Sequence, residues 1–98
     1  MDRIVHEPSR LSILTALKAR TSLSFRDLKG ITQLTDGMLS AQTKKLEEAG
    51  YLKIDKQFVG RKPQTTYSIT ENGNKAFDDY IKEMEVLIAK VNEQHKEG

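Results

Sequence analysis

The chain has 98 residues, of which 37% are hydrophobic and 31% are charged, so it can form one domain that buries roughly 60 to 65% of its unfolded surface. A domain of this size has little room for a deep catalytic cleft. No apolar run approaches the roughly 20 residues needed to cross a bilayer, and no secretory signal follows Met1. Cysteine is absent, which excludes disulfides and thiolate metal sites. We therefore expect a cytoplasmic protein without a membrane partner.

The charges are unevenly distributed along the chain. Residues 1–70 contain 12 basic and 7 acidic residues, about +5, and residues 71–98 contain 4 basic and 7 acidic residues, about −3. A basic front suits contact with a polyanion, while an acidic end suits water or another protein chain. Ordinary solvated charge is the alternative interpretation.

Two short helices are predicted at the start of the chain. Pro8 suits a first helical turn, and the spacing of the leucines that follow predicts a helix over about residues 8–18. Ser24 and Asp27 form an S-x-x-D pattern that resembles a capping box and predicts a second helix ending near Gly30. The leucines of the first helix recur at three-residue steps: Leu11, Leu14 and Leu17.

A third helix is predicted between a Thr35 cap and a Gly50 stop. On a helical wheel its residues separate into two faces. The side expected in the core carries Leu39, Thr43 and Leu46. We expect the Thr43 hydroxyl to bond back to the Leu39 carbonyl. The opposite side carries small or charged residues, with one serine at its edge: Gly37, Ser40, Ala41, Lys44, Lys45 and Glu48.

After Gly50 the hydrophobic period changes from 3.6 to 2, which predicts two antiparallel strands. Leu52 and Ile54 alternate with polar residues in the first strand, as Tyr67 and Ile69 do in the second. The segment VGRKPQ between them supplies a glycine for the bend, two cations and a proline that cannot donate a ladder hydrogen bond. We expect a hairpin with a basic, proline-stiffened tip.

A long last helix is predicted over residues 71–92, with Thr70 as its N-cap. Its roughly 20 residues would form a rod about 30 Å long, which is more than so small a core can cover. We therefore expect part of it to pack on a partner helix; the alternative is packing wholly on its own domain. Residues 93–98 are expected to form a frayed polar tail. The apolar stripe of this helix comprises Phe77, Tyr80, Ile81, Met84, Leu87, Ile88 and Val91.

Helices followed by a basic hairpin have a use on duplex DNA, because the major groove admits one helix and the hairpin can reach an adjacent groove. The third helix would read DNA through Thr35, Gly37, Ser40, Ala41, Lys44 and Lys45. Its lysines suit phosphates or guanine edges, and its small residues let the backbone come close. The hairpin, or wing, would contribute Arg61, Lys62, Gln64, Thr65 and Thr66.

The segments SRLSIL, SFRDL, LTDGMLSAQTKKLEEAGYL and FVGRKPQTTYSITENGNKAF resemble winged-helix regulators related to the multiple-antibiotic-resistance (MarR) and arsenic-resistance (ArsR) repressors, especially a small one-domain bacterial and archaeal branch. The resemblance implies a mainly α winged helix-turn-helix, with a three-helix core, a two-stranded wing and a long C-terminal dimerisation helix. It further implies a homodimer that controls transcription; we expect a repressor, with an activator as the alternative. Two-fold symmetry then predicts an inverted DNA repeat.

The sequence departs from these relatives in two respects. Thr43 stands where many of them place a leucine on the core side of the reading helix. The cysteine and histidine ligands of metal-sensing relatives are missing, since His6 and His95 lie far apart, so we expect neither a metal nor a cofactor. A small-molecule effector would have to use a pocket at the dimer interface, between the first and last helices.

Two other functions were weighed. An enzyme is disfavoured because the catalytic and nucleotide-binding motifs are missing, and because Asp78 and Asp79 point about 100° apart on a helix. The second alternative is a winged helix that contacts proteins and not DNA, since this fold does not guarantee DNA binding.

Overall fold

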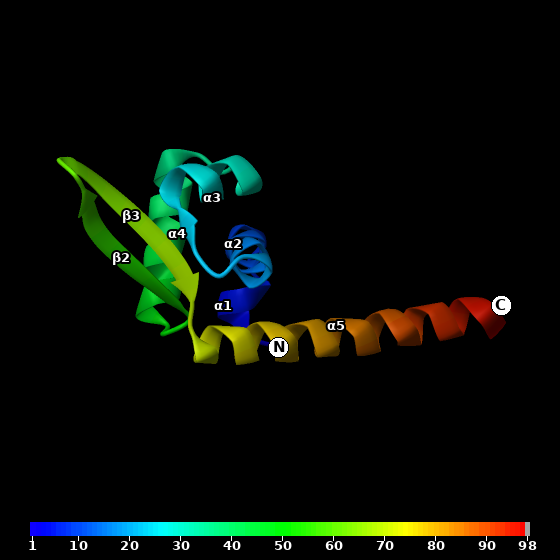
Figure 1. Cartoon of the computed structure of the whole chain (residues 1–98). Helices are drawn as coiled ribbons and strands as arrows, with labels where there is room; N and C mark the ends of the chain where they lie inside the picture. Colours follow the sequence, from blue (N-terminus) through cyan, green and yellow to red (C-terminus); the bar gives the residue numbers. More distant parts are fainter. Residues whose placement is uncertain (98) are drawn as a thin grey trace.

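A computed structural model describes the backbone of residues 1–97 and the side chains of residues 1–94. Within this part of the chain, several helices pack beside a small sheet that projects at one edge of the molecule, and a single long helix carries the chain away from the body (Figure 1). The molecule measures 63 × 24 × 20 Å. The elements are α1 Arg3–His6, α2 Pro8–Ala19, β1 Leu23–Ser24, α3 Phe25–Thr32, α4 Asp36–Glu48, β2 Leu52–Val59, β3 Lys62–Ile69 and α5 Glu71–Glu97.

The first element, α1, was not predicted from the sequence. It is a single turn whose N-cap, Asp2, accepts hydrogen bonds from the backbone N–H groups of Ile4 at 2.8 Å and Val5 at 3.2 Å. Val5 is fully buried and fastens this turn to the core. Four residues are too few to show a helical period, so the pattern could not reveal it.

The next two helices begin where they were predicted. Glu7 caps α2, and the Ser24 hydroxyl caps α3 by accepting from the Asp27 N–H at 3.1 Å. The predicted end of α3 near Gly30 is wrong by two residues, because the helix continues to Thr32. It ends at Gln33, which adopts the left-handed conformation with φ of 61°.

The sheet has three strands in the order β1-β3-β2, so the expected two-stranded wing gains a short third strand. Leu23 of β1 pairs with Tyr67 of β3. The strands β2 and β3 pair up to Val59 and Lys62, which leaves a two-residue turn. Gly60 has a φ of +67°, as the first position of a type II′ hairpin turn requires. Pro63 therefore lies in β3, opposite Phe58, and not in the turn as expected.

The core lies where α2, α3 and α4 meet the sheet. The predicted inner side of the third helix is confirmed: Leu39 and Leu46 are fully buried, and Thr43 is 1% exposed. Leu52 and Tyr67 cover this core from the sheet, and α2 contributes Ile13, Leu14 and Leu17. Buried aliphatic side chains of this kind each contribute about 1.5 to 3 kcal/mol, so the three-helix body is the stable part of the molecule.

The last helix starts as predicted, with the Thr70 hydroxyl accepting from the Gly73 N–H at 3.0 Å. At 27 residues, α5 is longer than expected and spans about 40 Å. Residues 93–97 belong to this helix, and the fraying expected of this polar end stays a prediction; Gly98 lies outside the described residues. Among the described helices none is long and apolar enough to span a membrane.

Candidate nucleic-acid interface

The helix α4 is fixed at both ends by hydrogen bonds. The Thr35 hydroxyl accepts from the Met38 N–H at 3.2 Å, as the predicted N-cap. At the other end Gly50 has a φ of +80°, its N–H donates to Glu47 at 2.9 Å, and the Tyr51 N–H donates to Leu46 at 3.0 Å. These two bonds form a Schellman motif, so α4 ends abruptly and the chain turns directly into β2.

The inner side of α4 holds the helix against the core and turns its other side outward. The Thr43 hydroxyl donates to the Leu39 carbonyl at 2.7 Å, as predicted, and it also lies 3.2 Å from the Ser40 carbonyl. These bonds satisfy a buried hydroxyl that would otherwise be costly. The rotation of α4 is therefore fixed by buried contacts, which leaves its outer side free to bind.

The outer side of α4 is exposed at every residue proposed to read DNA. An added Cβ at Gly37 would meet no atom within 4 Å, so a flat surface can approach the backbone closely there. At the start of the helix, Asp36 forms an ion pair of 2.6 Å with Lys29. The exposed set is Thr35, Gly37, Ser40, Ala41, Lys44 and Lys45.

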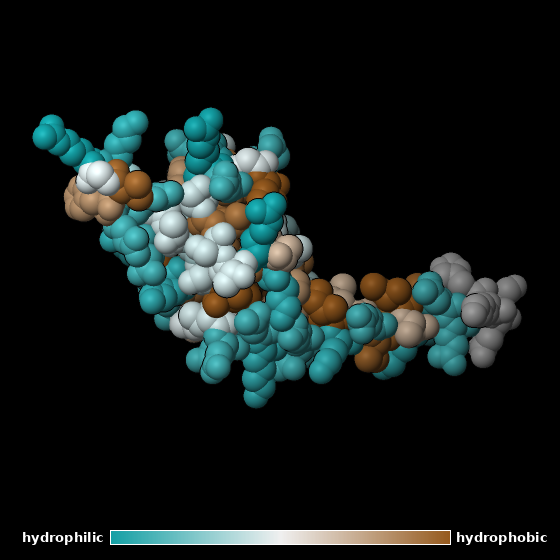
Figure 2. Space-filling model, viewed as in Figure 1, coloured by the Kyte–Doolittle hydropathy of each residue, from teal (hydrophilic) through white to brown (hydrophobic). Residues whose placement is uncertain are grey.

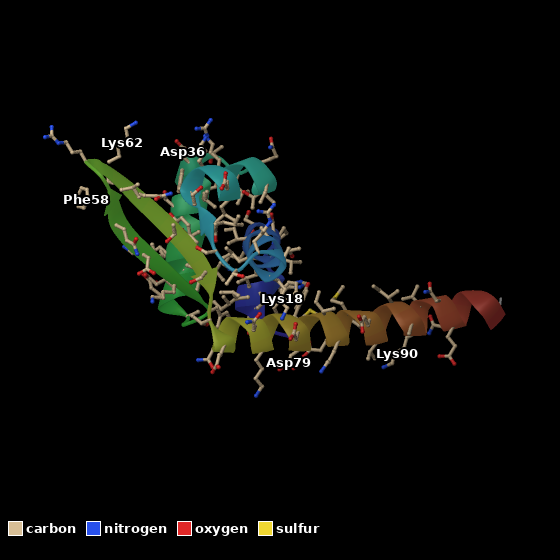
Figure 3. All side chains as sticks on the ribbon, in the orientation of Figure 1. Lys18, Asp36, Phe58, Lys62, Asp79 and Lys90 are labelled. Carbon is tan, nitrogen blue, oxygen red and sulfur yellow. The ribbon has the colours of Figure 1, made fainter. Side chains whose placement is uncertain are left out.

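The proposed wing residues differ in exposure. Arg61, Lys62 and Gln64 are exposed, whereas Thr65 and Thr66 are half-buried. The register of the hairpin puts successive residues on opposite sides of the sheet, and Figure 3 shows Lys62 and Phe58 pointing away from each other at the tip. Phe58, which was not among the predicted site residues, is 75% exposed.

A groove of about 670 Å³ separates α4 from the sheet. Lys44 enters it from the helix, while Lys56 and Thr65 enter it from the hairpin. Burial raises the pKa of the Tyr67 phenol in this groove; a hydrogen bond with Thr43 opposes the rise and Glu47 adds to it. Tyr67 thus stays a neutral part of the groove floor. The lining residues are Phe25, Ser40, Thr43, Lys44, Glu47, Ile54, Lys56, Thr65 and Tyr67.

The electrostatics of this edge favour an anion. Residues 56–70 contain Lys56, Arg61 and Lys62 and no acidic residue. Among the side chains that the structure describes, Lys44, Arg61 and Lys62 take part in no ion pair. Figure 2 shows hydrophilic side chains projecting from the upper edge of the molecule, where the hairpin tip and α3 lie in Figure 1. Cations without partners at one edge leave their charge available to a polyanion.

The apolar stripe of α5 divides into two environments. Phe77 and Tyr80 are 8% and 5% exposed, so these two predicted dimer-interface residues are core residues of the chain itself. Ile81 and Met84 are half-buried against the same core. Beyond them, three side chains between 47% and 54% exposed continue the stripe and form a distal apolar patch. The patch comprises Leu87, Ile88 and Val91. Val86 is also exposed, at 55%, but it lies about 100° round the helix from Leu87, off the stripe.

A second apolar surface lies on α2 and α3. The predicted effector pocket would lie between the first predicted helix, which is α2, and the last helix. The apolar surface is a groove of about 570 Å³, and all of its lining residues come from α2 and α3. The predicted contribution of the last helix is not made by α5 of the same chain. The lining residues are Pro8, Leu11, Ser12, Thr15, Ala16, Ala19 and Ile31.

Of the two histidines that the sequence offers as metal ligands, only His6 has a described side chain. His6 Nδ1 lies 2.9 Å from the Tyr80 hydroxyl, and the side chain of His95 is outside the described residues. Among the described residues, no three metal-ligating side chains come together. Asp78, once weighed as a catalytic acid, forms a 3.0 Å ion pair with Lys18.

The chain belongs to the family of winged helix DNA-binding domains, whose model matches residues 9–88. It is 35% identical over 82 residues to an uncharacterized protein of Methanocaldococcus jannaschii, covering 84% of this chain and 89% of the relative. A transcriptional regulator homologue from Pyrococcus horikoshii superimposes with a TM-score of 0.86 at 27% identity, covering 92% of this chain and 89% of that one.

The predicted resemblance to MarR-type regulators is confirmed at the level of the fold. A MarR family transcriptional regulator from Silicibacter pomeroyi superimposes with a TM-score of 0.70 at 17% identity, covering 88% of this chain and 56% of that chain. The chain therefore shares its winged-helix fold with that regulator, with α4 as the third helix of the three-helix core and the β2–β3 hairpin as the wing.

Proposed function

We propose that this protein is a homodimeric repressor that binds an inverted repeat in double-stranded DNA. The observation that carries the proposal is the meeting of two features at one edge: the exposed outer side of α4 and a hairpin tip whose cations have no acidic neighbour within residues 56–70. An α-helix fits the major groove, and an arginine at a hairpin tip suits a narrow, electronegative minor groove. Both elements can therefore engage one duplex.

Within this interface the residues have different tasks. Lys44, Arg61 and Lys62 bind phosphates or line a groove and supply most of the affinity, since contacts to phosphate carry no sequence information. Ser40 and Ala41 face the bases: the serine hydroxyl can hydrogen-bond to a base edge, and the alanine can pack on a thymine methyl group. A protein that covers the duplex in this way blocks other proteins there, which supports repression.

The DNA-binding test compares variants in their response to salt. We expect Arg61→Ala and Lys44→Ala each to weaken binding and to reduce the slope of log K against log salt concentration by about 1, because each removes one phosphate contact. Lys90→Ala is the matched control, since Lys90 lies on the projecting part of α5, away from the wing (Figure 3). Fluorescence anisotropy on duplexes selected from a random pool, between about 50 and 200 mM salt, measures both quantities.

Two outcomes would contradict the DNA-binding proposal. One is failure to select any duplex, and the other is binding that does not respond to salt. Either would favour the protein-contact module as the function of this winged helix.

The distal apolar patch supports a dimer. Three half-exposed side chains on each of two chains offer roughly 6 kcal/mol, if each contributes about 1 kcal/mol on burial. Association costs on the order of 4 to 15 kcal/mol in lost freedom, so the patch by itself gives a marginal dimer. The apolar groove on α2 is a second surface that the partner's α5 can cover. A small-molecule effector, where one acts, would bind between α2 and that helix.

Leu87→Arg tests the dimer. We expect this substitution to yield monomers and to weaken DNA binding, because a charge replaces an apolar side chain at the centre of the patch. Glu85→Arg, on a different side of the same helix, is the control and should leave the dimer intact. Sedimentation equilibrium reports the mass of each variant. An unchanged dimer in the Leu87→Arg protein would overturn the assignment.

The symmetry of the binding site is a separate consequence of a two-fold dimer. Selected duplexes should contain inverted half-sites about one helical turn, roughly 34 to 36 Å, apart. Recovery of single asymmetric sites would leave DNA binding in place but would contradict the proposed dimer arrangement.

A further inference from the structure

Phe58 is an apolar side chain near the tip of the wing, and it neither adds to the basic charge there nor packs in the core. Phe58 is 75% exposed, more than any other large hydrophobic side chain of the described residues, and its neighbour Val59 is 61% exposed. Full burial of a phenylalanine contributes about 1.5 to 3 kcal/mol, so this aromatic ring contributes little to folding where it lies. Its exposure makes it available to a binding partner.

The hairpin register defines where Phe58 lies. It pairs with Pro63 of β3. It follows Lys56 by two residues in β2, so the two side chains lie on the same face of the sheet. Lys56 lines the groove that separates the hairpin from α4. Phe58 therefore extends that side of the hairpin to the tip. Lys62 occupies the other side, where it pairs with Val59 (Figure 3).

The surroundings of Phe58 identify the kind of partner. Within residues 56–70 the charged side chains are Lys56, Arg61 and Lys62, and all three are cations. An apolar side chain set among cations without an acidic neighbour complements a surface that carries both negative charge and C–H groups. The minor groove of DNA has this composition, since phosphates border it and deoxyribose rings form its walls.

We propose that Phe58 packs against the deoxyribose wall of the minor groove while Arg61 and Lys62 bind the phosphates beside it. This rests on the proposed function, because it assigns an apolar contact to a wing that binds DNA. The minor groove is about 6 Å wide, so a hairpin tip that enters it meets both walls. Apolar side chains are known to enter this groove in other DNA-binding proteins.

The proposal has a distinctive consequence. Phosphate contacts release counterions and weaken as salt rises, whereas an apolar contact with sugar releases no counterions. We therefore expect Phe58→Ala to weaken binding about tenfold at every salt concentration, with the slope of log K against log salt unchanged. Arg61→Ala should lower that slope by about 1. The salt dependence of binding therefore distinguishes the apolar contact of Phe58 from the phosphate contact of Arg61.

The experiment measures the affinity of the full chain for a selected duplex by anisotropy between about 50 and 200 mM salt. Val59→Ala is the matched control for loss of an exposed apolar side chain and should bind within about twofold of the wild type. Phe58→Leu should recover most of the affinity. Thermal unfolding should be the same for all three variants, because the side chains are exposed.

A second duplex tests the place of the contact. On DNA truncated so that the flanking minor groove beneath the wing is missing, the wild type and Phe58→Ala should bind equally. If Phe58→Ala still binds the truncated duplex more weakly than the wild type does, Phe58 does not contact the flanking minor groove. If Phe58→Ala binds the full duplex as tightly as the wild type does, Phe58 makes no contact with DNA. If the wild type selects no duplex at all, the proposed function fails, and the contact of Phe58 with DNA fails with it.

Discussion

The two halves of α5 carry the same apolar spacing and meet opposite environments. In the first half Phe77 and Tyr80 are buried, and in the second half Leu87 and Val91 are 47% and 53% exposed. A stripe with a helical period thus shows which side of a helix is apolar, but the length of the domain beside it decides which part remains free. The first half holds the fold together, and the second half is available to a partner chain.

Polar contacts also bind the first half of α5 to the body. His6 Nδ1 lies 2.9 Å from the Tyr80 hydroxyl, and Lys18 Nζ lies 3.0 Å from Asp78 Oδ1. These contacts join α5 to α1 and α2, whereas within the described chain the distal patch is exposed and only Leu87 borders a pocket that Met1 also lines. The difference between the halves can be tested by substitution.

The largest effect is expected from Phe77→Ala, which should lower the free energy of unfolding by about 4 kcal/mol because it leaves a cavity in the core. Val91→Ala is the matched change in the second half and should stay within about 0.5 kcal/mol. Both should be measured by urea unfolding in a Leu87→Arg background, so that dimerisation does not contribute. Similar losses for the two substitutions would show that the halves are not distinct.

A second prediction concerns the first turn of α5, where it touches the start of β2. A Cβ added at Gly73 would collide with the Tyr51 carbonyl, which accepts a hydrogen bond of 3.1 Å from the Thr70 N–H. We expect Gly73→Ala to destabilise the protein by about 3 kcal/mol, since backbone must shift to make room. The collision lies in the first half of α5, so the loss should appear in monomers and dimers alike.

Gly30→Ala is the control for the second prediction. Gly30 lies within α3, and an added Cβ would meet no atom within 4 Å. This substitution should raise the free energy of unfolding by about 0.5 to 1 kcal/mol, because alanine favours helix more than glycine does. Chemical unfolding of both variants measures the contrast. Equal effects at the two positions would mean that the tight contact with Tyr51 is absent.

The sequence predicted the elements that depend on local rules. Thr35, Gly50 and Thr70 mark helix ends in the structure because caps and stops involve neighbouring residues. The inner side of α4 was also predictable, since the helical period fixes which residues share a side. The hydrogen bond from Thr43 to Leu39 followed from the same geometry.

The sequence did not predict features that depend on contacts between distant segments. The strand β1 is two residues long and exists because Leu23 pairs with Tyr67, 44 positions along the chain. The division of the α5 stripe depends on where the body ends, which is a property of the whole fold. Phe58 was missed because the hairpin was read for its charge, while its exposure depends on how far the strands extend beyond the core.

The smallest expected effect concerns α1, which helps to cover the first half of α5. Burial raises the pKa of the Asp2 carboxyl, but hydrogen bonds from Tyr51, Val5 and Ile4 lower it more, so the pKa lies below its ordinary value of 3.8. The Tyr51 hydroxyl donates to Asp2 Oδ2 at 2.6 Å. A carboxyl whose pKa is lowered on folding stabilises the protein above its unfolded pKa, and this contribution disappears as pH falls through the folded pKa.

Asp2→Asn should therefore lower the free energy of unfolding by about 1 kcal/mol at pH 7, because hydrogen bonds to a neutral amide are weaker than those to a carboxylate; this corresponds to roughly 4 to 8 °C in Tm. The difference from the wild type should shrink as pH falls from 3.8 through the lowered pKa of the folded protein, because in this range the unfolded carboxyl binds protons more readily than the folded one. Glu7, the N-cap of α2, titrates in both the wild type and Asp2→Asn: burial raises the pKa of its carboxyl, but hydrogen bonds from the Arg10 and Ser9 N–H groups lower it more. Both proteins therefore lose the stabilisation by Glu7 as pH falls. Only the difference between their free energies of unfolding reports the contribution of Asp2. A difference that stays constant from pH 7 to pH 2.5 would contradict the stabilising role of the Asp2 charge and leave α1 held by Val5 alone.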